Sequence, residues 1–240
     1  MFSLRRLPMF ARISAVAVSA TALSLIPGVS SAGAGPNGSL DQILPPGFPC
    51  IHTNVYPPIA TWGWTRLDGA EPAFAVGQGA SGNGYLHLFR PGSSQYASLF
   101  HPGLSTPLDQ LAKQRNALGF MYKGTATTFQ IRIRGASRVD SVLSGFTTLV
   151  WQPQHNGNRG ANGFVTANDL ARGKWWSTQK INGQTDRTTL LNLTQIAENN
   201  PRAWVSEYGV RNGTLDNENS YADNIVYGCS KWDFEPDAGS

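Results

Sequence analysis

Charged residues are scarce in this chain of 240 residues, which contains 19 Lys and Arg and 15 Asp and Glu. All of the acids lie after residue 40, whereas three of the basic residues, Arg5, Arg6 and Arg12, lie near the N-terminus. Without this N-terminal part, sixteen basic residues stand against fifteen acidic ones. A net charge so close to zero produces no long-range field that favours nucleic acid, so we expect no nucleic-acid partner.

The chain also lacks a long apolar run after its N-terminus. We therefore expect no membrane span, because a span needs about 20 apolar residues. Residues 13–29 are apolar and small, follow the three arginines, and end just before Ser30-Ser31-Ala32. A basic start, a short apolar stretch and small residues at the cut are typical of a secretory signal peptide. We interpret residues 1–32 as such a signal and expect the protein to be secreted.

Cysteine is nearly absent, since only Cys50 and Cys229 occur. In an exported chain an even number of cysteines suggests a disulfide, and two free buried thiols are the alternative. A bridge across so long a loop would stabilise the fold by at most about 5 kcal/mol. We expect it to hold the N-terminal arm against the last strand.

Common catalytic motifs are missing. No serine lies in a G-x-S-x-G turn, and the four histidines show no H-E-x-x-H spacing. Residues 77–82 match the glycine pattern of a dinucleotide-binding loop. The residues that follow predict another strand, however, and not the helix whose N-terminus would hold a pyrophosphate. We interpret this stretch as a hairpin turn.

Short alternating segments, separated by turn residues, make up most of the rest. Residues 128–134 are the clearest strand, because Phe129, Ile131 and Ile133 alternate with polar side chains. We expect further strands at residues 60–67, 73–76, 85–89, 95–100, 146–151, 202–210 and 220–229.

Helical signals are few. One short helix is expected after Thr106, with Thr106 as its cap and Pro107 as its first residue, and a second over residues 192–198. Many short strands with Gly-rich turns predict an all-β fold, an antiparallel β-sandwich of the jelly-roll type with two short helices. The expected organisation is an extended arm, a single sandwich domain and a loose acidic tail, at residues 33–49, 50–232 and 233–240.

Asp223 is a carboxylate inside the last apolar strand. Calcium takes several oxygen ligands in flexible geometry. We expect Asp223 to bind a structural calcium ion together with backbone carbonyls and an acid from the first strands, Asp68 or Glu71. The alternative is that the Asp223 carboxylate accepts hydrogen bonds from backbone N–H groups of a neighbouring loop.

Seven tryptophans need places in the fold. Trp62 and Trp64 would share one face of the strand expected around them, and Trp151 would end another strand. Trp175 and Trp176 are adjacent, so in a regular strand one indole faces inward and the other outward. Core packing is the alternative for each tryptophan.

A flat aromatic surface beside amides suits sugars, whose C–H faces stack on rings while their hydroxyls need donors and acceptors. Ligand sites combine apolar walls with a few placed polar groups. We predict a glycan site whose aromatic platforms come from Trp62, Trp64, Trp151 and Trp175. Its polar partners would be the amides that follow Trp151, namely Gln152, Gln154 and Asn156.

Several motifs of the second half support this interpretation: Gly173-Lys174-Trp175-Trp176, Asn200-Pro201-Arg202-Ala203, Tyr208-Gly209-Val210 and Tyr221-Ala222-Asp223-Asn224-Ile225. Through them, residues 146–234 resemble secreted bacterial jelly-roll proteins, largely uncharacterised, that are related to carbohydrate-binding modules with galactose-binding-like or concanavalin-like sandwiches. The resemblance implies a sandwich fold, carbohydrate binding, and a structural calcium site at the final aspartate. Jelly-roll alginate lyases share the architecture, but Gln130-Ile131-Arg132 has arginine where their motif has histidine.

The leading hypothesis is a secreted, non-catalytic β-sandwich that binds a polysaccharide or cell-surface glycan. One alternative is a polysaccharide-degrading enzyme, a hydrolase or lyase, that uses Glu207 with Asp140 or Asp223, because glycoside hydrolysis needs two carboxylates across a cleft. Another is a structural protein of the cell envelope that has no small ligand.

Overall fold

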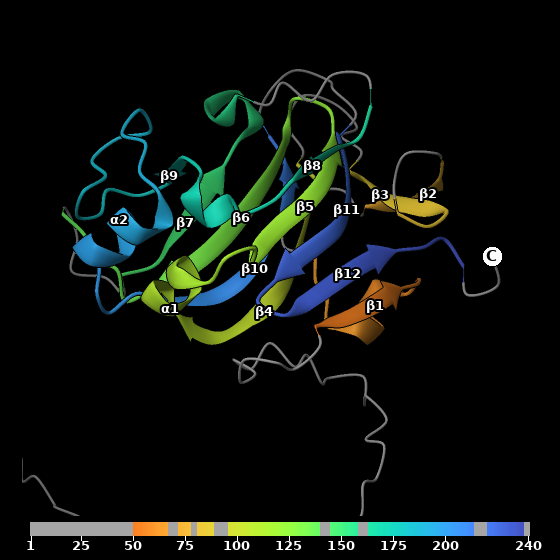
Figure 1. Ribbon diagram of the computed structural model, residues 1–240, viewed down its shortest axis with the longest axis horizontal. Coiled ribbons are helices and arrows are strands. Elements are labelled where there is room, and N and C mark those ends of the chain that lie inside the picture. The colour runs from red at the N-terminus through yellow and green to blue at the C-terminus, as the bar shows by residue number, and fades with distance from the viewer. Residues whose placement is uncertain are drawn as a thin grey trace, which may run out of the picture. The chain divides into compact units, whose positions relative to one another are not determined.

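Two β-sheets pack face to face around one hydrophobic core in the computed structural model (Figure 1). The structure describes residues 50–66, 72–77, 81–88, 96–139, 145–157, 163–213 and 220–237. The predicted signal at residues 1–32 and the predicted arm at residues 33–49 lie outside this part of the chain. The all-β sandwich expected from the sequence is confirmed.

The larger sheet is built around β11 (Ser220–Tyr227). One edge of β11 pairs with β5 (Leu118–Lys123), which in turn pairs with β8 (Val165–Ala167). Its other edge is shared by β12 (Ser230–Phe234) and β3 (Gly84–Leu88). The outermost strands are β1 (Ile51–Val55), beside β12, and β2 (Ala73–Val76), beside β3.

The smaller sheet has five strands in the order β4-β10-β6-β7-β9. Their bounds are Ser98–Pro107, Trp204–Asn212, Thr127–Arg134, Thr147–Trp151 and Trp175–Ser177. β10 comes late in the chain but lies between β4 and β6, just as β11 lies between β5 and β3. Such returns are typical of Greek-key sandwiches. Among the described pairs only β1 and β12 are parallel.

The core lies between the two sheets and follows the alternation of the sequence. Phe129, Ile131 and Ile133 of β6 are fully buried, as expected. They meet aromatic side chains of β5 across the core, and the ring centroids of Phe120 and Phe129 are 5.5 Å apart. The alternate residues of β6, such as Thr128 and Gln130, lie on the other face of the sheet, where only 2% and 7% of their surface is exposed.

Two short α-helices, α1 (Leu108–Lys113) and α2 (Leu193–Asn199), lie together at one end of the sandwich (Figure 1). α2 begins with a capping box, in which the backbone N of Gln195 donates to Asn192 Oδ1 at 2.9 Å. The cap predicted for α1 is wrong, because the Thr106 hydroxyl donates to the Gly103 carbonyl and Pro107 is the N-cap. No helix in the described ranges is long and apolar enough to cross a membrane.

The strand predicted at residues 60–67 is also wrong. Ile59–Trp62 form a 3-10 helix, η1, and the segment after it contributes only an isolated bridge between Thr65 and Phe100. The physical reason is Gly63, whose φ of 79° lies in the left-handed region and interrupts an extended path. Two further 3-10 helices in the described chain are η2 (Pro153–Asn156) and η3 (Leu170–Arg172).

A disulfide joins the first described residue to the turn before β12. Cys50 and Cys229 form the predicted disulfide, and the backbone N of Ile51 donates to the Cys229 carbonyl at 2.8 Å. The last strand is β12, which continues to Phe234, and Glu235 beyond it is buried. The expected loose tail therefore does not begin at residue 233.

Candidate functional site

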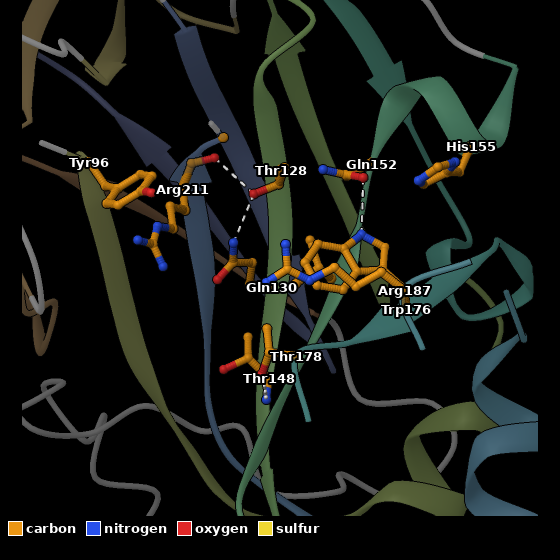
Figure 2. A pocket seen from close by; sticks show the side chains of 12 residues that line it. Tyr96, Thr128, Gln130, Thr148, Gln152, His155, Trp176, Thr178, Arg187 and Arg211 are labelled. Atoms are coloured by element: carbon orange, nitrogen blue, oxygen red, sulfur yellow. Dashed lines mark hydrogen bonds between the residues drawn. The ribbon is translucent and has the colours of Figure 1, made fainter. Parts of the chain in front are cut away.

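A groove of about 510 Å³ crosses the outer face of the smaller sheet. Its floor consists of side chains that alternate with core residues, such as Thr128 and Gln130 on β6 and Thr148 on β7. Figure 2 shows these side chains in a row, with Trp176 of β9 on one side and Arg211 of β10 on the other. The groove is thus built by four neighbouring strands.

Hydrogen bonds order the amide and hydroxyl groups of the floor. Gln130 Nε2 donates to Thr128 Oγ1 at 3.0 Å, and that hydroxyl donates to the backbone carbonyl of Arg211 at 2.9 Å (Figure 2). The backbone N of Thr148 donates to Thr178 Oγ1 at 3.1 Å. These bonds fix where the remaining donor and acceptor positions of the floor point.

Trp176 forms one wall of the groove. Its indole Nε1 donates to Gln152 Oε1 at 3.0 Å (Figure 2), which orients the ring. The guanidinium carbon of Arg187 lies 5.1 Å from the indole centroid, a cation–π contact. This wall therefore presents an aromatic surface and a positive charge together.

The turn that carries Arg187 is held by Asp186. Asp186 Oδ1 accepts hydrogen bonds from the backbone N–H groups of Thr188 and Thr189 at 2.9 and 2.8 Å, and from their hydroxyls at 2.7 and 2.9 Å. The hydroxyl bonds first, and then the backbone bonds, lower the pKa of Asp186 to about 2. Charge-assisted bonds of this kind preorganise the turn next to the groove.

The opposite wall of the groove also pairs an arginine with an aromatic ring. The guanidinium carbon of Arg211 lies 4.0 Å from the ring centroid of Tyr96. His155, from η2, also lines the groove, and among the described lining residues there is no Asp or Glu. Glu207, further along β10, pairs with Arg132 at 3.1 Å. The charge of the described groove is therefore positive.

The tryptophans predicted as sugar platforms do not line this groove. Trp64, Trp151 and Trp175 are at most 2% exposed and belong to the core, so no ligand reaches their rings. Trp62 is half-buried, and its Nε1 donates to the Tyr56 carbonyl at 3.0 Å. Trp62 and Trp64 also do not share a strand face, because Trp62 ends η1.

Trp176 was not chosen from the sequence, although one of the two adjacent indoles had to face outward. Trp175 pairs with Trp151, and Trp151 pairs with the buried Phe129, so the register turns all three residues inward. This register joins segments that are far apart in the chain. No local pattern around residue 176 could have supplied it.

The predicted amides have three different positions. Gln152 lines the groove, as expected of a site residue. Gln154 is exposed and donates to the Thr125 carbonyl at 3.2 Å, outside the groove. The side chain of Asn156 connects the segment of Gln152 with that of Lys174. It accepts a hydrogen bond from the Lys174 backbone N at 2.7 Å and donates to the carbonyls of Gln152 and Lys174. Asn156 thereby aligns Gln152 with the strand that carries Trp176.

The predicted calcium ligand Asp223 is fully buried in the larger sheet. Its Oδ1 accepts from the backbone N of Phe234 at 3.0 Å, and its Oδ2 accepts from Asn224 Nδ2 at 3.1 Å. Asp68 and Glu71 lie outside the described residues, and within them no three His, Cys, Asp or Glu side chains form a group that could hold a metal. Calcium binding at Asp223 remains a prediction. A backbone N–H group does donate to the carboxylate, as in the alternative, but it belongs to Phe234 of strand β12 and not to a neighbouring loop.

The chain matches no protein-family model and no curated protein sequence. The class of protein is therefore defined by the fold and the groove: an all-β sandwich whose smaller sheet carries a polar groove between two arginine–aromatic pairs.

Proposed function

We propose that the protein is a secreted, non-catalytic β-sandwich that binds a polysaccharide or cell-surface glycan in the groove of the smaller sheet. The observation that carries this proposal is the row of amides and hydroxyls beside the half-buried indole of Trp176. Sugar hydroxyls need paired donors and acceptors, while the C–H face of a sugar needs an apolar surface. The volume of the groove, about 510 Å³, also lies within the range of roughly 300–1,000 Å³ typical of ligand sites.

Two further features support the proposal. The resemblance of residues 146–234 to carbohydrate-binding jelly-roll proteins implies the same ligand class. The signal expected at residues 1–32 and the disulfide agree with export to a compartment where glycans are encountered.

The decisive experiment is binding to a broad panel of polysaccharides, by glycan array and calorimetry, with single groove variants. Gln130→Ala and Trp176→Ala should each weaken binding by about fivefold or more, because each removes a contact worth about 1 kcal/mol or more. Trp176 does not belong to the buried core, so thermal melting of its variant should change little. Gln130 is only 7% exposed, so its variant is compared with the wild type at a temperature well below its own melting transition.

Gln154→Ala is the matched control, since Gln154 is an exposed amide outside the groove. It should bind like the wild type. The proposal fails if the wild type binds nothing on the panel, or if the groove variants bind as tightly as the control. The structural-envelope alternative would then take its place.

The enzymatic alternative has no specific observation in its favour. Glu207 is paired with Arg132, Asp223 is buried in the other sheet, and Asp140 lies outside the described residues. A reducing-sugar release assay and an absorbance assay for unsaturated products, on the same panel, would reveal hydrolysis or elimination.

A further inference from the structure

We infer that the glycan held in this groove is acidic, with a carboxylate or sulfate group that binds Arg187. This inference rests on the proposed function and names its ligand class. It follows from the placement of Arg187 on Trp176 and from the lack of acids among the described residues of the groove.

Arg187 is positioned to meet an anion. Its side chain is exposed, and it forms no ion pair with the described residues. The adjacent carboxylate, Asp186, is engaged by the Thr188 and Thr189 hydrogen bonds and holds the turn in place. Stacking on Trp176 orients the planar guanidinium, whose forked N–H groups match a carboxylate or sulfate in a bidentate way.

Arg211 lies at the opposite wall, where its guanidinium carbon is 4.0 Å from the Tyr96 ring centroid. Figure 2 shows Arg211 across the polar floor from Trp176. A glycan chain bound at Arg187 would extend over the amides and hydroxyls of the floor toward this wall.

The groove is positive although the chain is nearly neutral after its expected signal. The described lining includes Arg187, Arg211 and His155 and no acid. A cleft lined by one sign of charge raises the local concentration of a ligand of the opposite sign. The amides and hydroxyls between the arginines would bind the uncharged hydroxyls of the same chain.

The test compares three polymers by calorimetry at fixed pH: a polyuronate, a sulfated polysaccharide and a neutral polysaccharide. At least one acidic polymer should bind tenfold or more tightly than the neutral one, and its affinity should fall as salt concentration rises. The first two polymers distinguish carboxylate from sulfate as the recognised group.

Variants of Arg187 test the contact itself. Arg187→Gln should weaken binding of the acidic polymer by roughly 10- to 100-fold, as expected for loss of a charged hydrogen bond, and Arg187→Lys should lose less because it keeps the charge. Arg115→Gln, which removes an exposed arginine from the turn after α1, is the control and should leave affinity unchanged. Melting curves of all variants confirm that the fold is retained.

The outcomes separate the two proposals. Tight, salt-independent binding of the neutral polymer would overturn the acidic ligand while leaving glycan binding in place. An unchanged affinity of Arg187→Gln for the acidic polymer would overturn it as well. Absence of binding to all three polymers and to the broad panel would overturn the proposed function, and the acidic ligand with it.

Discussion

Among single residues, Asp223 has the most unusual environment. Consecutive side chains of a strand normally point to opposite faces, yet Asp223 and Asn224 are both buried. The cause is a β-bulge between Asp223 and Val226, in which Asn224 takes a φ of 49°. The bulge withdraws the Asp223 carboxyl from water and brings it close to a second acid, Asp233 of β12.

The stability of the protein should depend on pH through this residue. Burial first, and then the nearby Asp233 charge, raise the pKa of Asp223 from 3.8 to about 8. The folded state holds the Asp223 proton more tightly than the unfolded chain does. The stabilisation that the protonated Asp223 contributes to the folded state is therefore complete below pH of about 4 and is lost as pH rises to about 8. Asp223→Asn should remove this decrease, as measured by urea unfolding at several pH values in the presence of a chelator.

Asp109→Asn is a suitable control, because Asp109 is a surface acid whose hydrogen bond to Lys113 lowers its pKa. It should keep the decrease between pH of about 4 and 8. An equal decrease in wild type and Asp223→Asn would contradict the prediction. Replacing the chelator by calcium tests the predicted metal site, since a calcium ion on ionised Asp223 would raise stability near neutral pH.

Among the secondary-structure elements, β10 has a central position, because it pairs with β4 and β6 along its length. Gly209 lies within β10, opposite Phe100 of β4 and Gln130 of β6. A Cβ atom added at Gly209 would lie 2.0 Å from the carbonyl oxygen of Leu99. Only a residue without a side chain allows β4 and β10 to approach this closely.

We therefore expect Gly209→Ala to lower the free energy of unfolding by roughly 1–3 kcal/mol, since two backbones must separate to admit the methyl group. Chemical denaturation measures the change. Gly163→Ala is the matched control, because an added Cβ there has nothing within 4 Å. Equal stabilities of the two variants would show that β10 can shift without cost.

At the scale of the whole molecule, the disulfide joins the first and last described strands of the larger sheet. Cys50 precedes β1 and Cys229 precedes β12, and the two strands pair in parallel along five residues. Among the described strands, β1 pairs only with β12. The bridge therefore holds an edge strand whose pairing would otherwise depend on β12 alone.

The double variant Cys50→Ser, Cys229→Ser should lose about 2–5 kcal/mol of stability, the usual effect of removing a native disulfide. Hydrogen exchange should show the location of the change, with faster exchange in β1 than in wild type and little change in β6. Denaturant unfolding of the reduced wild type is the control and should match the variant. Equal stability of the variant and the oxidised wild type would mean that β-pairing alone holds β1.

Much of the fold could be predicted because its signals are local. The alternation of residues 128–134 identified β6 and its inward side chains, and the capping residues located α2. The position of α1 was also predicted, although its cap was not. The site could be predicted only in part. Gln152 was identified through the amide-rich loop, whereas Gln130, Arg187 and Arg211 come from three separate segments that meet only in the folded sheet.

The sequence by itself determined the all-β class and the inward side chains of strands such as β6, because period-two patterns need no knowledge of distant partners. It also allowed only one cysteine pair, whereas the core strand β5 was not predicted. Only the tertiary structure decided which indole faces the solvent. Trp175 and Trp176 are equivalent by local pattern, and the pairing of β9 with β7 turns Trp175 into the core and Trp176 toward the groove. Strand register is set by contacts between residues far apart in the chain, and a shift by one residue would exchange the two faces.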